Sequence, residues 1–294
     1  MKIESERAAT LCGLTAILLW STASGLIRSV SMDFGPIGGA ALIYTLGSFL
    51  LLLIFGRPRI RRTPRMYLLL GSALFVAYEL CLSLALGYAI NSTQAIQLNV
   101  VNNLWPCLTV LLAILMNGQR ARWMIVPGSA LALAGILWVV STEGLSISSI
   151  IDNIKSSPIS FSLAGGCAIT FALYCNVTRR YAGGQNLVAL FFTLTATILW
   201  IKYALSDESI SPRGLPAVFE LLAAGIAMAG GYALWNIGVL RGNLTLMATA
   251  SYSTPVLSSA FAGMWLGAQL TSQFWQGALL VTVGSLMCWF ATRR

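Results

Sequence analysis

Residues 106–135 read PCLTVLLAILMNGQRARWMIVPGSALALAG, and residues 255–284 read PVLSSAFAGMWLGAQLTSQFWQGALLVTVG. One proline and three glycines hold the same spacings of 12, 10 and 7 residues in both stretches, at an offset of 149 residues. The matched positions are Pro106 and Pro255, Gly118 and Gly267, Gly128 and Gly277, and Gly135 and Gly284. We therefore predict that the two halves of the chain are copies of one structural unit.

The composition around these stretches is that of a membrane protein. Of the 294 residues 57% are hydrophobic and only 9% are charged, and the mean hydropathy is +0.79. Apolar segments of about 20 residues recur along the chain, long enough to cross a hydrocarbon core roughly 30 Å thick. The net charge is +9, and the basic residues that produce it lie between these segments. This distribution argues against a nucleic-acid-binding face. We expect an all-α integral membrane protein.

The apolar segments predict ten membrane-spanning helices. Their ranges are 8–29, 36–55, 66–90, 94–116, 123–142, 159–178, 187–205, 217–239, 244–265 and 273–291. Residues 1–145 would form a first five-helix repeat and residues 159–294 a second, joined by an outer connection over 146–158. Because five spans is an odd number, the second repeat would be inverted relative to the first, an architecture found in transporters with a central site. A cleavable signal peptide ending near residues 20–24 is the competing interpretation of the N-terminus, but removing the first span would break the pairing of the repeats.

The basic residues indicate the orientation of these spans. With the N-terminus inside, 14 of the 18 Lys and Arg residues fall on the inner side, and four fall on the outer side or at outer helix ends. Cytoplasmic connections carry the excess of Lys and Arg in membrane proteins. We expect both termini to lie in the cytoplasm.

Glu79 is the acidic residue that the pattern places near the middle of a span. A charged side chain there is costly, so we expect Glu79 to be neutral, hydrogen-bonded or open to water. One interpretation is proton coupling or recognition of a substrate amino group. The other is a structural carboxyl group that bonds a neighbouring helix.

The fourth span carries the polar sequence NVVNNLWP, residues 99–106. Its three asparagines share one face of a helix, and the proline removes one helical hydrogen bond beside them. The pattern resembles the interrupted helices that build binding sites at the membrane midplane, although hydrogen bonding between helices is the structural alternative. Pro106 and its repeat mate Pro255 are therefore candidate hinges.

Other spans offer polar and aromatic residues on single faces. Ser251, Thr254 and Ser258 share a face of the ninth span, and Met228, Tyr232, Trp235 and Asn236 follow one stripe of the eighth. The first span offers Gly13, Trp20 and Ser24, the sixth Thr170 and Tyr174, and the third Tyr78 beside Glu79. Packing between helices is the alternative interpretation of each stripe.

Several classes of function lack the residues that they need. The chain has no histidine and no glycine-rich phosphate-binding loop with its lysine, so we expect no enzyme activity, no cofactor, no metal and no ATP hydrolysis by this chain. The six cysteines fall within apolar segments without metal or redox spacing. A passive channel is a further alternative, but a continuous wet pore needs a more polar lining than these stripes provide.

The chain resembles the drug/metabolite transporter superfamily in three features. These are ten spans in two copies, a proline in the fourth helix of each copy with a glycine 12 residues later, and WSTAS at residues 20–24. The NVVNNLWP segment and YEL at residues 78–80 are most similar to its bacterial branch of aromatic amino-acid exporters. The resemblance covers essentially the whole chain.

The resemblance implies a multi-pass exporter of the bacterial inner membrane that moves aromatic amino acids and related amphipathic compounds through a central cavity by alternating access. An exporter of lipophilic cations from the same superfamily is the alternative. The implied partners are the small-molecule substrate and the lipid bilayer, with no ATPase subunit and the chain acting as a monomer. The predicted cavity residues are Trp20, Tyr78, Glu79, Asn99, Asn102, Asn103, Trp105, Tyr174, Tyr232, Trp235 and Ser251.

The predicted orientation can be tested at the connection formed by residues 56–65, which contains five arginines. A reporter that is active only in the cytoplasm, inserted in this connection, should be active, because the positive-inside rule places it there. The same reporter inserted at residues 146–158 should be inactive. The opposite result at both sites would overturn the orientation.

Overall fold

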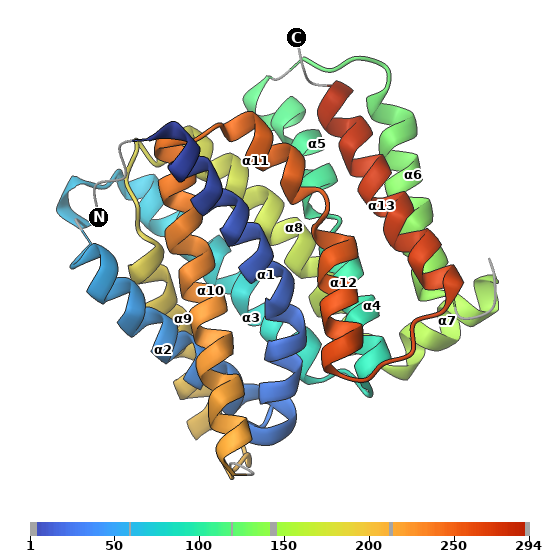
Figure 1. The fold of residues 1–294 in the computed structure, drawn as a ribbon, viewed down its shortest axis with the longest axis horizontal. Coiled ribbons are helices and arrows are strands. Elements are labelled where there is room, and N and C mark those ends of the chain that lie inside the picture. The colour runs from blue at the N-terminus through green and yellow to red at the C-terminus, as the bar shows by residue number, and fades with distance from the viewer. Residues whose placement is uncertain (1–4, 59, 119, 142–145, 212–213, 292–294) are drawn as a thin grey trace.

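A computed structural model describes residues 5–58, 60–118, 120–141, 146–211 and 214–291. These residues form helices and their connections, with no strand among them, and the helices make one bundle (Figure 1). The start of α1 and the end of α13 lie at the same end of that bundle (Figure 1). The helices are α1 (Glu6–Phe34), α2 (Pro36–Phe55), a 3₁₀ turn (Ile60–Arg62), a π-helical turn (Tyr67–Gly71), α3 (Ser72–Gly87), α4 (Ser92–Asn102), α5 (Trp105–Asn117), α6 (Ile125–Val140), α7 (Ile147–Ser156), α8 (Pro158–Tyr181), α9 (Val188–Ala204), α10 (Leu215–Arg241), α11 (Leu244–Ser251), α12 (Thr254–Trp265) and α13 (Ser272–Ala291).

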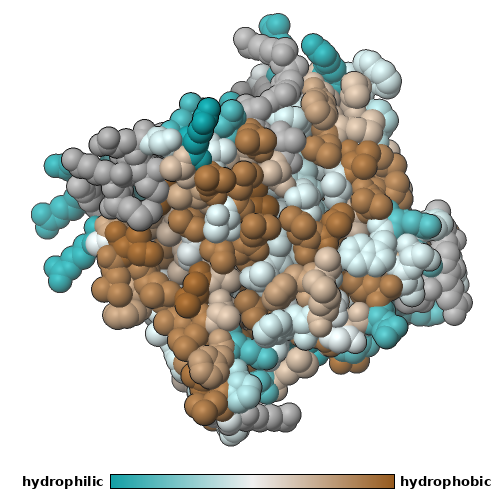
Figure 2. Space-filling view, in the orientation of Figure 1, coloured by the Kyte–Doolittle hydropathy of each residue, from teal (hydrophilic) through white to brown (hydrophobic). Residues whose placement is uncertain are grey.

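The bundle has the surface of a membrane protein. Within the described ranges, seven helical segments are long and apolar enough to cross a membrane, and α6 and α9 are shorter apolar helices. Large apolar side chains such as Leu53, Leu115 and Phe219 are exposed on the outside of the bundle. Figure 2 shows hydrophobic residues across the middle of one face and most hydrophilic residues toward its edges. An apolar outer surface of this kind is matched to lipid rather than to water.

The predicted spans correspond to helices, with three differences. Helix α1 continues to Phe34, beyond the predicted end at residue 29. The fourth predicted span is divided between α4 and α5, and the ninth between α11 and α12. The outer connection contains α7, a helix that the sequence reading missed. The predicted repeat boundary at residue 145 lies outside the described residues.

The junction of α1 and α2 shows how polar backbone groups are satisfied at a helix end. Gly35 turns the chain with a φ of +82°, a conformation that favours glycine. The first free N–H groups of α2 then need acceptors. Glu208, which follows α9, accepts hydrogen bonds from the N–H groups of Ile37 at 2.9 Å and Gly38 at 3.1 Å. This carboxylate therefore ties the start of α2 to the far half of the sequence.

Helices from the two halves of the sequence pack in pairs. The most extensive contacts join α1 to α10, α6 to α13, α2 to α9 and α3 to α8. In the α6–α13 pair the repeated glycines meet. A Cβ atom on Gly284 would lie 2.6 Å from the carbonyl oxygen of Gly128, and one on Gly135 would lie 2.7 Å from the carbonyl oxygen of Gly277. The glycines are needed because the two backbones approach too closely for any side chain.

Replacing Gly284 by alanine should therefore destabilise the bundle. Overpacking of this kind costs about 1–3 kcal/mol, so Gly284→Ala should lower the melting temperature of the purified protein in detergent. Gly165, in α8, is the matched control, since a Cβ atom there would meet no heavy atom within 4 Å. Gly165→Ala should leave the melting temperature unchanged or raise it, because alanine favours helix more than glycine does. Equal losses in both variants would contradict this account of the α6–α13 contact.

Candidate functional site

A cavity of about 190 Å³ lies in the middle of the bundle. Helices α1, α10, α11 and α12 line one side of it, and α3, α4, α5 and α8 line the other. The lining residues are Trp20, Ala23, Ser24, Tyr78, Leu82, Asn99, Asn102, Asn103, Trp105, Phe171, Cys175, Met228, Tyr232, Trp235, Ser251, Thr254 and Ser258. An apolar cavity of about 150 Å³ can hold benzene, so this volume accommodates one aromatic ring with a small polar group.

Both interruptions of the helices open onto this cavity. Helix α4 ends at Asn102 and α5 begins at Trp105, with Pro106 in its first turn. Helix α11 ends at Ser251 and α12 begins at Thr254, with Pro255 in its first turn. Proline lacks an N–H group and is accepted in a first helical turn, where that donor has no helical partner. The two candidate hinges thus start the second half of each broken helix, and the break exposes helix-end dipoles to the cavity.

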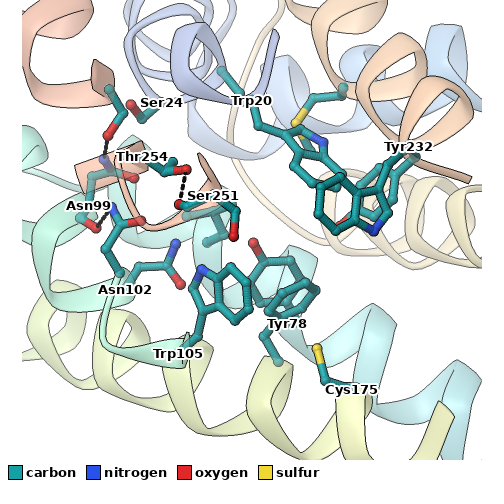
Figure 3. Close-up of a pocket in the computed structure, with 17 residues that line it drawn as sticks. Trp20, Ser24, Tyr78, Asn99, Asn102, Trp105, Cys175, Tyr232, Ser251 and Thr254 are labelled. Carbon is teal, nitrogen blue, oxygen red and sulfur yellow. Dashed lines mark hydrogen bonds between the residues drawn. The ribbon is translucent and has the colours of Figure 1, made fainter. Parts of the chain in front are cut away.

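Aromatic rings line two sides of the cavity. The ring of Trp20 packs edge-on against Tyr232 with centroids 5.1 Å apart, and against Trp235 at 5.3 Å. On the opposite side, Phe171 contacts Tyr78 at 4.2 Å and Trp105 at 4.8 Å. Figure 3 shows Trp20 and Tyr232 grouped apart from Tyr78 and Trp105. Aromatic rings in offset or edge-to-face contact attract one another beyond simple burial, so a ligand ring between these groups would find suitable partners.

The remaining wall is polar and uncharged. The side-chain amide of Asn99 donates a hydrogen bond to the Ser258 hydroxyl at 2.9 Å, which joins α4 to α12. Asn103 donates to the Asn99 backbone carbonyl at 2.8 Å, and Thr254 donates to the Ser251 carbonyl at 2.6 Å. These bonds are drawn in Figure 3. No Asp, Glu, Lys or Arg is among the described residues that line the cavity.

Asn102 connects the polar wall to its surroundings. Its side-chain oxygen accepts a hydrogen bond from the Cys167 thiol at 3.0 Å. The side chain is therefore held from α8. A fixed amide at the end of α4 is a preorganised polar group for a ligand.

Most of the predicted site residues are brought together in this cavity. Of the predicted set, the residues that line it are Trp20, Tyr78, Asn99, Asn102, Asn103, Trp105, Tyr232, Trp235 and Ser251. Tyr174 does not line it, because its ring packs behind the wall against Phe75 at 5.3 Å and Phe191 at 6.1 Å. On α8 the lining residues are Phe171 and Cys175 instead, one position beyond the predicted Thr170 and Tyr174.

Glu79 also lies behind the wall. It is fully buried and accepts hydrogen bonds from the Tyr44 hydroxyl at 2.6 Å and the Tyr232 hydroxyl at 2.8 Å. The Ser83 hydroxyl in turn donates to the Tyr44 hydroxyl at 3.2 Å. Tyr232 does line the cavity. The Glu79 carboxyl group therefore affects a ligand through the position of the Tyr232 ring, and not by direct contact. This arrangement fits the expectation that a polar group at this depth is hydrogen-bonded.

Comparison with known proteins places the chain in a family. Residues 7–141 match the model of the EamA-like transporter family. The chain is 51% identical to the aromatic amino acid exporter YddG of Salmonella typhimurium and 52% identical to that of Escherichia coli K12, in each case over 99% of both chains. It is also 29% identical to the aromatic amino acid exporter YddG of Ancylobacter novellus, over 87% of this chain and 88% of the relative.

A solved crystal structure has the same fold. It covers 99% of both chains with a TM-score of 0.69 and 26% sequence identity. The sequence relatives confirm the resemblance to the branch of aromatic amino-acid exporters, and they indicate transport rather than catalysis. The chain belongs to the EamA-like transporter family, within the drug/metabolite transporter superfamily.

Proposed function

We propose that the protein exports aromatic amino acids across the bacterial inner membrane as a secondary transporter, by alternating access to the central cavity. The observation that carries the proposal is the cavity itself, which combines an aromatic wall with an uncharged polar wall at two broken helices. An aromatic amino acid has the matching parts, a ring and a zwitterionic group. The names of the relatives that match over the full chain support this assignment.

The proposed architecture is ten spans in two inverted repeats, residues 1–145 and 159–294 with residues 146–158 between them, both termini in the cytoplasm and a single chain as the working unit. The glycine contacts between α6 and α13 support it. Gly128 faces Gly284, and Gly135 faces Gly277. The offset of 149 residues relates Gly128 to Gly277 and Gly135 to Gly284. Exchanging the repeat mates therefore converts the first contact into the second. Contacts that exchange in this way, between antiparallel helices, are what a two-fold axis in the membrane plane produces.

The neutrality of the cavity favours a zwitterion over a lipophilic cation. A buried cation needs a compensating negative charge, and no carboxylate is among the described residues that line the cavity. Glu79 directly follows the lining residue Tyr78 in the sequence. Each of its two carboxyl oxygens accepts a hydrogen bond from a tyrosine hydroxyl. A zwitterion brings its own opposite charges and can be bound by dipoles alone.

Transport in proteoliposomes tests the proposed substrate class. The wild type should show saturable uptake and counterflow of tryptophan and phenylalanine, and much weaker flux of ethidium, a lipophilic cation. Trp20→Ala should raise the half-saturating concentration by about tenfold or more, because burial of a large apolar side chain contributes about 1.5–3 kcal/mol. Trp123, which is 78% exposed, is the matched control, and Trp123→Ala should behave as the wild type. Ethidium flux without amino-acid flux would move the protein to the cation exporters.

A second set of variants tests the role of Glu79. We propose that it acts as a positioning residue that holds the Tyr232 ring in the cavity wall. Glu79→Gln should retain most of the uptake, because a carboxamide can still bond both hydroxyls. Glu79→Leu should lose affinity, since each buried hydroxyl left without a partner costs about 1–3 kcal/mol. Both the wild type and Glu79→Gln should respond alike to an imposed pH gradient. A response that disappears only in Glu79→Gln would instead make this residue a proton carrier.

A further inference from the structure

Helix α1 contains four buried serines, and three of them have clear hydrogen-bond partners. Ser21 donates to the Ile17 carbonyl at 2.8 Å and Ser31 to the Ile27 carbonyl at 2.7 Å. Ser29 donates to the Glu220 carboxylate at 2.6 Å. Bonding to a carbonyl four residues earlier is the usual arrangement for a serine within a helix. These three side chains are accounted for by the fold.

Ser24 is different. Its side chain is 8% exposed, and its hydroxyl oxygen has no hydrogen-bond partner among the described residues. A buried hydroxyl without a partner is costly, so such a group in a native structure calls for an explanation, and a bound water or ligand is one that applies beside a cavity. Ser24 lines the central cavity. Its unpaired hydroxyl oxygen, itself buried, therefore lies at the edge of the space that the substrate would occupy.

The surroundings of Ser24 indicate which part of a substrate it would meet. Figure 3 shows Ser24 beside the hydrogen bond that joins Asn99 to Ser258. Ser258 lies in the second turn of α12, whose N-terminus carries partial positive charge. The start of α12 therefore favours a carboxylate near Ser24.

The spacing along α1 agrees with this placement. Trp20 and Ser24 are one helical turn apart on the same face, about 6 Å along the axis. Trp20 belongs to the aromatic wall with Tyr232. An amino acid whose carboxylate meets Ser24 can therefore direct its ring along α1 toward Trp20.

We propose that the Ser24 hydroxyl donates a hydrogen bond to the carboxylate of the bound aromatic amino acid. Ser24 thereby orients the substrate and distinguishes an amino acid from the corresponding amine. The inference rests on the proposed function, because it assigns one contact within the same cavity.

Calorimetric titration of the purified full-length protein in detergent tests this contact. The ligands are L-phenylalanine and phenethylamine, which has the same ring and amino group but no carboxylate. Ser24→Ala should weaken phenylalanine binding by about tenfold or more, as expected for a lost hydrogen bond to a charged group, and should leave phenethylamine binding unchanged. Ser24→Thr, which keeps the hydroxyl, should retain the wild-type preference for phenylalanine.

Ser285 provides the matched control. Its hydroxyl is also buried and without a partner among the described residues, but it lies in α13 and does not line the cavity. Ser285→Ala should bind both ligands as the wild type does. Unchanged phenylalanine binding by Ser24→Ala, or an equal loss for both ligands, would overturn the proposed contact. If the wild-type protein bound no aromatic amino acid, the proposed function itself would be overturned. The proposed hydrogen bond from Ser24 would then be overturned as well.

Discussion

The structure depends on one constraint, which is that a polar group inside a bilayer needs a partner from the protein, from trapped water or from a ligand. A chain with 9% charged residues meets this constraint by forming helices almost everywhere. Among the described residues, the two predicted spans that depart from helix in their interior do so where α4 gives way to α5 and where α11 gives way to α12. Both departures face the central cavity. Irregular backbone is tolerated at that depth when it lines a cavity, so the breaks and the cavity depend on each other.

The same constraint explains how the two sides of the cavity are held together. Specific hydrogen bonds join helices around the cavity, as in the bond from Asn99 on α4 to Ser258 on α12 and the bond from Tyr232 on α10 to Glu79 on α3. These contacts are few, and each is directional. The glycine contacts of α6 and α13 are different, because two backbones in close van der Waals contact resist sliding and provide no alternative arrangement. We expect the α6–α13 pair to be a stationary element and the cavity-lining helices to be the moving ones.

The sequence was sufficient to predict an all-helical apolar chain, the prolines beside the two breaks and most of the cavity lining, because hydropathy and helical periodicity report which faces are apolar. It was not sufficient to fix the rotation of each helix about its own axis. On α8 the predicted residues, Thr170 and Tyr174, are displaced from the observed ones by one position, which corresponds to 100° of rotation. That rotation is set by contacts with other helices, such as the packing of Tyr174 on Phe75. The burial of Glu79 was likewise hidden, because it requires Tyr44 from α2 to approach α3.

Helix α7 shows a second limit of sequence reading. Its ten residues are too short and too polar for a span, so a search for spans treats them as a loop. Yet Ile147, Ile151 and Ile154 share one exposed face, while Asn153 turns toward the bundle and donates a hydrogen bond to the Val140 carbonyl at 2.7 Å. That bond satisfies a free carbonyl at the end of α6. The spacing of these isoleucines is typical of an amphipathic helix, but the contact of Asn153 with the end of α6 is not visible in the ten residues alone.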